Sequence, residues 1–465
     1  MLPLVVAAVL AASPPSASPR PAPRAHPKAS TTLYVPQLNK ADGLAAFLRA
    51  AGEKASLFRP EGWRPELHPL LWLDLTDPAS LAELGVDPKG SATWSVVGPA
   101  RVICLTLADV KRHQEKLAAK LAPLGPKRTS KAKNGVALTA ATQLDQPVAG
   151  YALKGKEVCA VHGGGTSIDG LLEDAAKLVA QPSTGGIWKK VATTNDAAYW
   201  VSPRGVVGAR GSAKSLTADV RGRFPAPALE GSGPSPYANV PPSGLALMRA
   251  RVARSGVSAV TSTLRGQLAA LCPVCEPEAL LAVTSDLTPL LTGNVLLWAD
   301  SVKVRESLRS PAARYFAVRH VYLAEVSQPE EAKKALAALS SWKNAKATGD
   351  GFLLTLKGGE VRVGLAGPHL YLGNDAATVS AALAAVNGAS GKMPHGAELL
   401  VDPKAVAKGL AQISLLDVVG SQELAGLFAA GTELGALLAH SERIEAFADS
   451  QDDRSHRAVV TWTLP

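Results

Sequence analysis

The chain has few cysteines, few aromatic residues and no long apolar stretch beyond its first residues. Four cysteines in 465 residues are too few for a small disulfide-dense scaffold. Aromatic residues make up 5% of the chain, which is sparse for the stacking platforms that bind single-stranded nucleic acid. After the N-terminal segment, no run of about 18 apolar residues could cross a bilayer as a helix. We therefore expect no nucleic-acid partner and no transmembrane span in the mature chain.

The signature motifs of several enzyme classes are also absent. The chain has no Walker loop, no H-E-x-x-H and no G-x-G-x-x-G after a strand, and its nine histidines are scattered. These absences predict no metal site and no cofactor, and they favour a non-enzymatic role. Apolar residues reach 47%, enough for a substantial core, and the formal net charge is +10. A chain of this length holds roughly two to four domains.

Residues 1–12 predict a signal peptide, because they contain an apolar run that is too short to span a membrane. Residues 13–30 follow as a tether with six prolines, three basic residues and no acid, a composition that favours extended polyproline conformations. No cysteine follows the expected cleavage site, so we expect no lipoprotein anchor. The alternative is a buried strand or helix at the start of a cytosolic protein. We predict a periplasmic or secreted protein.

The rest of the chain predicts two similar lobes, residues 31–223 and 243–465, joined by a Pro-rich linker at 224–242. In the first lobe, an alternating strand at 101–107 precedes a helical pattern that ends at Leu121. In the second lobe, a strand at 319–326 precedes a helix that Pro329 starts.

A second shared unit lies further along each lobe. A strand, a glycine turn and a strand at 151–161 recur at 363–372, so that Gly155 matches Gly367. A helix is expected after each. The longer basic loop expected at 127–134 absorbs the small change in offset between the copies. The fold class predicted is α+β, an internally duplicated two-lobe protein with antiparallel sheets covered by helices.

The segment Leu84-Gly85-Val86-Asp87-Pro88-Lys89-Gly90 precedes a strand–helix–strand unit that a glycine turn and a short helix close. In this pattern the chain resembles a bacterial family of exported α+β proteins catalogued only as a domain of unknown function. The resemblance covers most of residues 31–465. It implies export and a duplicated sheet architecture, and it implies no activity.

Cys104 and Cys159 lie on two predicted strands of the first lobe. The two repeat offsets place Tyr322 and Tyr371 at the matching positions of the second lobe. Because both positions change together between the copies, we predict a cross-strand disulfide between Cys104 and Cys159, and packing of Tyr322 against Tyr371. Export would supply the oxidising compartment. The alternative is two buried free thiols that act as small apolar residues.

Cys272-Pro273-Val274-Cys275 is the sharpest short motif of the chain. A C-x-x-C pair can be a redox dithiol, half of a zinc site or a closed structural loop. A redox motif of the thioredoxin type follows a strand, whereas residues 261–271 have a helical pattern, and no second ligand pair for zinc exists. We favour a disulfide between Cys272 and Cys275 that closes a turn between two helices.

His162-Gly163-Gly164-Gly165 resembles the oxyanion-hole string of lipases and esterases. That chemistry also needs a G-x-S-x-G elbow, and the string at 165–169 has Asp169 in place of the last glycine. We favour a structural turn before a helix. A hydrolase that uses this turn, or a thiol-redox protein that uses the C-x-x-C motif, is the alternative function.

Positive charge is concentrated in two stretches, which could bind an anionic envelope polymer, lipid head groups or another envelope protein. The predicted anion-binding residues are Lys127, Arg128, Lys131, Lys133, Lys303, Arg305 and Arg309, and the second stretch continues through Arg314 to Arg319. The alternative is a solvated basic surface. The leading hypothesis is an exported, non-enzymatic binding or scaffolding protein of the cell envelope.

Overall fold

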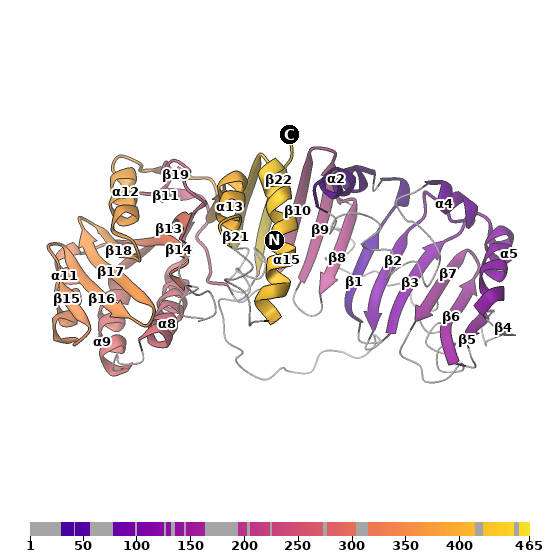
Figure 1. Ribbon diagram of the computed structural model, residues 1–465, viewed down its shortest axis with the longest axis horizontal. Coiled ribbons are helices and arrows are strands. Elements are labelled where there is room, and N and C mark those ends of the chain that lie inside the picture. The colour runs from indigo at the N-terminus through magenta and orange to yellow at the C-terminus, as the bar shows by residue number, and fades with distance from the viewer. Residues whose placement is uncertain are drawn as a thin grey trace. The chain divides into compact units, whose positions relative to one another are not determined.

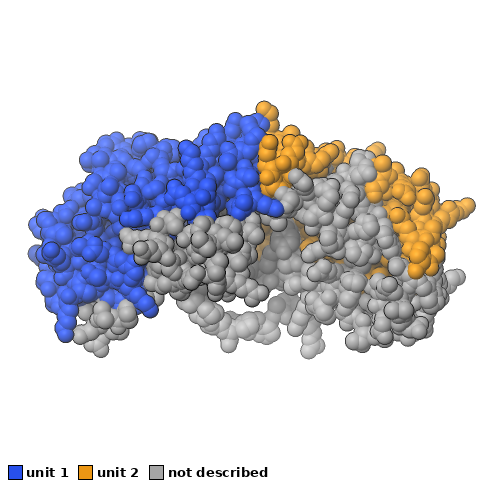
Figure 2. All heavy atoms as spheres, in the orientation of Figure 1, with its two compact units in different colours: residues 1–16, 223–465 blue, residues 17–222 orange. Residues whose placement is uncertain are grey.

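A computed structural model describes residues 29–40, 42–55, 78–97, 100–124, 127–131, 135–143, 146–162, 194–201, 205–223, 226–272, 277–303, 315–413, 422–450 and 455–465. The chain divides into two compact units, and Figure 2 shows their atoms in separate colours. Unit 2 comprises residues 17–222, and unit 1 comprises residues 1–16 and 223–465. In the described ranges, no helix is long and apolar enough to cross a membrane.

The strands of unit 2 form an antiparallel sheet in the order β10-β9-β8-β1-β2-β3-β7-β6-β5-β4 (Figure 1). They are β1 (Ala29–Val35), β2 (Ala92–Val97), β3 (Ala100–Thr106), β4 (Lys127–Lys131), β5 (Ala137–Gln143), β6 (Gln146–Lys154), β7 (Glu157–His162), β8 (Ala197–Val201), β9 (Gly205–Ser212) and β10 (Ser215–Gly222). The described helices are α2 (Asp42–Gly52), α4 (Pro78–Glu83) and α5 (Val110–Leu121), with 3-10 turns at Leu38–Lys40 and Ala122–Leu124.

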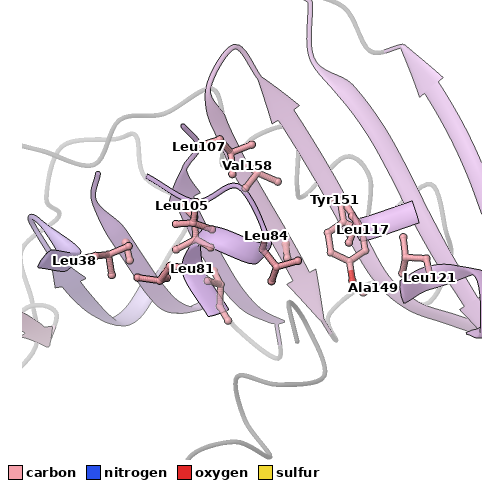
Figure 3. Packing of buried hydrophobic residues seen from close by; sticks show 14 residues of the cluster. Leu38, Leu81, Leu84, Leu105, Leu107, Leu117, Leu121, Ala149, Tyr151 and Val158 are labelled. Carbon is pink, nitrogen blue, oxygen red and sulfur yellow. The ribbon is translucent and has the colours of Figure 1, made fainter. Parts of the chain in front are cut away.

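Helix α5 covers one face of this sheet. The carboxylate of Asp109 accepts a hydrogen bond from the backbone N–H of Arg112, which satisfies one of the free donors at the helix start. Leu117 and Leu121 then recur on one side of the helix and pack in a buried cluster with Tyr151 and Val158 of the sheet (Figure 3). The expected helix ending at Leu121 is therefore present, and its apolar stripe builds the core of unit 2.

The strands of unit 1 follow the order β22-β21-β20-β12-β13-β14-β18-β17-β16-β15, again antiparallel. They are β12 (Ala246–Arg251), β13 (Leu291–Val302), β14 (Val318–Val326), β15 (Ala345–Ala347), β16 (Gly351–Leu356), β17 (Gly359–Ala366), β18 (His369–Gly373), β20 (Ala397–Val401), β21 (Arg443–Ser450) and β22 (His456–Thr463). The short strands β11 (Gly233–Ser235) and β19 (Gly391–Met393) pair separately.

Helices cover both faces of the unit 1 sheet. They are α8 (Arg254–Leu271), α9 (Pro277–Leu287), α11 (Pro329–Ala337), α12 (Ala376–Val386), α13 (Pro403–Leu410) and α15 (Gln422–His440). On one face, Leu323 and Tyr371 are buried with Val379 of α12. On the other face, Leu365 and Leu370 pack against Leu336 of α11. The predicted α+β class, with antiparallel sheets covered by helices, is confirmed.

The ten strands listed for unit 2 and the ten listed for unit 1 pair in the same order. In this comparison β1 corresponds to β12, and β7 corresponds to β18. A hydrogen bond from the Leu107 N–H to the Lys156 carbonyl in unit 2 has a counterpart from Val326 to Pro368 in unit 1. This agreement concerns the order of pairing alone. The internal duplication itself stays a prediction.

The Pro-rich segment expected as a linker is packed into unit 1 over residues 226–242, the described part of it. Tyr237 is fully buried in the core beside α12, and β11 pairs with β19. The Arg249 guanidinium donates to the carbonyls of Tyr237, Ala238 and Val240. Proline and glycine exclude long helices and central strands, but they leave carbonyls and side chains free to dock in an irregular segment.

Candidate anion-binding site

The predicted disulfide between Cys104 and Cys159 is confirmed. The two residues face each other directly on β3 and β7, with their Cα atoms 4.0 Å apart. Cys159 is buried, and the bond joins positions 55 residues apart in the chain. The face that carries the bond is opposite the one that packs against α5, because neighbouring residues of a strand point to opposite faces.

The predicted contact between Tyr322 and Tyr371 is wrong. Tyr371 faces Leu323, and Tyr322 faces Leu372, so the two tyrosines lie on opposite faces of the sheet. The sequence offset that we predicted between the residues of β3 and those of β14 is one residue too small. The backbone hydrogen bonds that match between the two units align Leu107 with Val326.

The position of the disulfide is therefore occupied in unit 1 by Leu323 and Tyr371. Space for the large ring comes from Gly364 on the neighbouring strand, since a Cβ atom there would collide with the Tyr371 hydroxyl. In unit 2, Ala152 holds the matching place beside the smaller Cys159.

Cys272 is disulfide-bonded, and its expected partner Cys275 lies outside the described residues. Cys272 directly follows α8, is 3% exposed and packs in a core cluster with Phe316 and Leu356. The Asn344 side-chain amide donates to its sulfur at 3.2 Å. Reactive cysteines are partly exposed and close to positive charge, so this environment favours the structural interpretation of the motif.

The esterase-like string begins at the last residue of β7, His162, and its glycines Gly163 to Gly165 lie outside the described residues. No group of three or more metal-binding side chains occurs in the part of the chain that the structure describes.

The structure separates the residues predicted to bind anions. Lys127, Arg128 and Lys131 lie on β4, which pairs only with β5 among the described strands. The sequence analysis predicted a loop at these residues. The described part of that segment is instead an edge strand, which pairs with β5 (Ala137–Gln143). Basic residues on an edge strand also discourage pairing with another chain. Lys133, Arg305 and Arg309 lie outside the described residues, whereas Lys303 is exposed just after β13.

Lys303 belongs to a cationic cluster that the fold builds at the start of α12. Arg319 of β14 lies on the same face, its Nε 3.6 Å from the Asp375 carboxylate. Arg362 of β17 faces Gly373, two residues before Asp375. We call Lys303, Arg319 and Arg362 the basic cluster. Lys303 and Arg319 thus act on the Asp375 carboxylate, and Arg362 lies on the strand that pairs with the end of β18.

The turn itself is held rigidly by its polar side chains. The Asp375 carboxylate accepts from the backbone N–H and the hydroxyl of Thr378, which caps α12. The Asn374 side-chain oxygen accepts from the His320 N–H, and its amide donates to the Val318 carbonyl at 2.7 Å. These bonds fix the helix start against β14.

Burial, hydrogen bonds and nearby cations together set the ionisation of Asp375. Burial by itself would raise the pKa of Asp375, but the Thr378 hydrogen bonds and the charges of Arg319 and Lys303 together lower it. Asp375 therefore stays ionised and neutralises one charge of the cluster. Its side chain is 24% exposed and that of Arg319 is 39% exposed, so both groups are accessible to a ligand. Lys346 of β15 is a further, exposed cation on the same face as Arg362.

Sequence reasoning named Lys303 and Arg319 as part of one basic stretch, but it missed Arg362. The signal available was weak, because Arg362 is a lone charge in an alternating strand. Only the pairing of β17 with β18 brings it to the start of α12.

Comparisons with known proteins give no family. No family model matches the chain, and no curated protein matches it. The solved structure of crystal form III of TP0453 has 9% sequence identity and a TM-score of 0.21, and the match covers 77% of this chain and 94% of that chain. Crystal form I of TP0453 gives 8% identity and the same TM-score and coverage. Similarity at this level carries no argument about this protein.

Proposed function

We propose that the protein is an exported binding protein of the cell envelope that holds anionic material through the basic cluster of unit 1. The observation that carries this proposal is the placement of Lys303 and Arg319 beside the Asp375 carboxylate at the start of α12, with Arg362 facing Gly373 on the adjacent strand. Two guanidinium groups and an ammonium can form charge-assisted hydrogen bonds to phosphate, sulfate or carboxylate groups.

Export is supported by the disulfide between Cys104 and Cys159, because such bonds persist in oxidising compartments and are rare in the cytosol. It is also supported by the apolar segment at residues 1–12 and by the basic, Pro-rich tether that follows. Membership of the exported family that the sequence resembles remains a proposal of the same kind.

The proposal is tested by measuring binding of the purified mature protein to immobilised envelope material from its own host. The triple variant Lys303→Gln, Arg319→Gln, Arg362→Gln removes the cluster. We expect it to bind at least about tenfold more weakly, a loss of roughly 1.4 kcal/mol. Binding of the unaltered protein should also weaken in about 1 M salt, where the Debye length is about 3 Å.

The matched control removes three positive charges elsewhere in the same unit, through Lys333→Gln, Lys334→Gln and Lys343→Gln. Lys333 and Lys334 are exposed on α11, and Lys343 is exposed before β15. If both triple variants bind equally weakly, net charge alone explains retention and the basic cluster has no special role. If neither variant loses binding, the proposed site is wrong.

A further inference from the structure

The turn that follows α12 places an asparagine directly before a glycine, at Asn387 and Gly388, and both residues are exposed. Gly388 has a φ of 77°, in the left-handed region that favours glycine, and a Cβ atom there would meet open space. Among the described asparagines, Asn387 alone precedes a glycine, and Asn134, which also does, lies outside the described residues. The turn thus combines access to solvent with the least hindered neighbour that an asparagine can have.

The side-chain amide and the backbone nitrogen of this turn are both free to move. Within the described ranges, the Asn387 side chain makes no hydrogen bond, and the Gly388 N–H donates to no backbone carbonyl. By contrast, other asparagine side chains of unit 1 each donate a hydrogen bond: Asn239, Asn294, Asn344 and Asn374. An amide that is held in this way cannot rotate toward the next backbone nitrogen, whereas that of Asn387 can.

We propose that Asn387 is a site of spontaneous deamidation, because asparagine is chemically labile and both reacting groups are accessible here. The Gly388 nitrogen loses its proton to the solvent and attacks the Asn387 Cγ atom. The new N–Cγ bond closes a succinimide ring, the Cγ–Nδ2 bond breaks, and the nitrogen leaves as ammonia after taking up a proton. Water then opens the ring at either carbonyl. The product is aspartate, or isoaspartate, in which the backbone runs through the former side chain.

The isoaspartate product lengthens the backbone immediately before contacts that hold the Pro-rich segment. Ala389 is 5% exposed, and its carbonyl accepts a hydrogen bond from the Asn239 N–H at 2.8 Å. The Ser390 carbonyl accepts from the Asn239 side-chain amide at 2.9 Å. Both bonds attach residues 226–242 to the chain that follows α12. An added methylene group displaces these carbonyls, so isoaspartate at position 387 loosens the segment, whereas aspartate adds only a charge.

The test incubates the purified, folded protein in mildly alkaline buffer and follows each asparagine by peptide mass spectrometry, with an isoaspartate-specific methyltransferase as the second readout. We expect Asn387 to be converted at least about tenfold faster than Asn239, Asn344 or Asn374, because a glycine follows it and its amide is free. A parallel incubation in urea gives the rate in the unfolded chain. If Asn387 reacts rapidly in urea but as slowly as the other asparagines in the folded protein, the fold protects the turn and the proposal is wrong.

Two variants separate the modification from its structural effect. Asn387→Gln keeps an amide at this exposed position but would have to close a larger ring, so we expect conversion to fall by at least about tenfold. Asn387→Asp carries the charge of the product on an unaltered backbone. After incubation, we expect protease to cleave residues 226–242 severalfold faster in the unaltered protein, and at the original rate in Asn387→Gln. Equally fast cleavage of fresh Asn387→Asp would overturn the role of the longer backbone, and unchanged cleavage of the deamidated protein would overturn the loosening of the segment.

Discussion

At the scale of single residues, buried histidines connect the stability of the protein to pH. His320 is buried between Tyr315 and Tyr322, whose rings meet it edge to face with centroids 4.8 Å and 5.5 Å away. Its Nδ1 lies 2.8 Å from the Val318 carbonyl. Burial lowers the pKa of His320, and the bond to Val318 offsets this in part. His113 of α5 is buried in the same way beside the Leu84 carbonyl, and its pKa is also lowered.

This arrangement predicts loss of stability in mild acid. Because the pKa of His320 is lower in the folded state, the unfolded chain binds the proton more readily, and stability falls as pH drops below about 6.5. We expect His320→Phe to reduce the decrease in unfolding free energy between about pH 7.5 and pH 5, measured by urea denaturation. His440→Phe, which makes the same substitution at an exposed histidine, is the comparison variant. An unaltered slope in the His320 variant would contradict the prediction.

At the scale of strands and helices, pairing register decides which side chains meet. The sequence pattern identified the strands that carry Cys104 and Cys159, and it identified the helices at α5 and α11 from their apolar period and from Pro329. The register of β14 was one residue away from expectation, and a shift of one residue exchanges the two faces of a strand. That single residue leaves Leu323, and not Tyr322, opposite Tyr371.

The disulfide between β3 and β7 is expected to stabilise unit 2. It links β3 to β7 across 55 residues of chain, and closing a loop of that length stabilises by about 4 kcal/mol in the chain-entropy model. We expect Cys104→Ser, Cys159→Ser to lower the midpoint of denaturant unfolding of unit 2 markedly. Leu323→Ala is a control, because it should destabilise unit 1 and leave unit 2 unchanged. A double variant as stable as the unaltered protein would show that the bond is dispensable.

At the scale of the whole molecule, the segment between the two sheets belongs to unit 1. Residues 226–242 are attached by Tyr237 in the core, by the Arg249 guanidinium and by the pairing of β11 with β19. Arg249 is itself held by Glu398, at 2.7 Å, on the neighbouring strand. Arg251 binds Glu230 at 2.6 Å and thereby fixes the first part of the segment. The compact unit that holds the candidate site therefore includes chain that precedes β12.

Tyr237 provides the test of this organisation in the full chain. Its hydroxyl lies 3.2 Å from His369 Nδ1, and its ring is fully buried. We expect Tyr237→Phe to cost about 1 kcal/mol, the value of one hydrogen bond. Tyr237→Ala should cost roughly 3–5 kcal/mol and expose residues 226–242 to proteolysis. Equal, small effects of both substitutions would mean that the segment is only loosely attached.

The sequence by itself determined the α+β class, the main helices and the disulfide between Cys104 and Cys159. The class and the helices depend on local periodicity and on helix-starting residues. The disulfide was predicted from a repeat offset that is one residue too small, although its two strands do pair as expected. Only the tertiary structure decided the strand order, the register of β14, the docking of residues 226–242 and the basic cluster with Arg362. The physical reason is that these features join residues far apart in the sequence. Their pairing is set by the packing of whole faces, which no local pattern records.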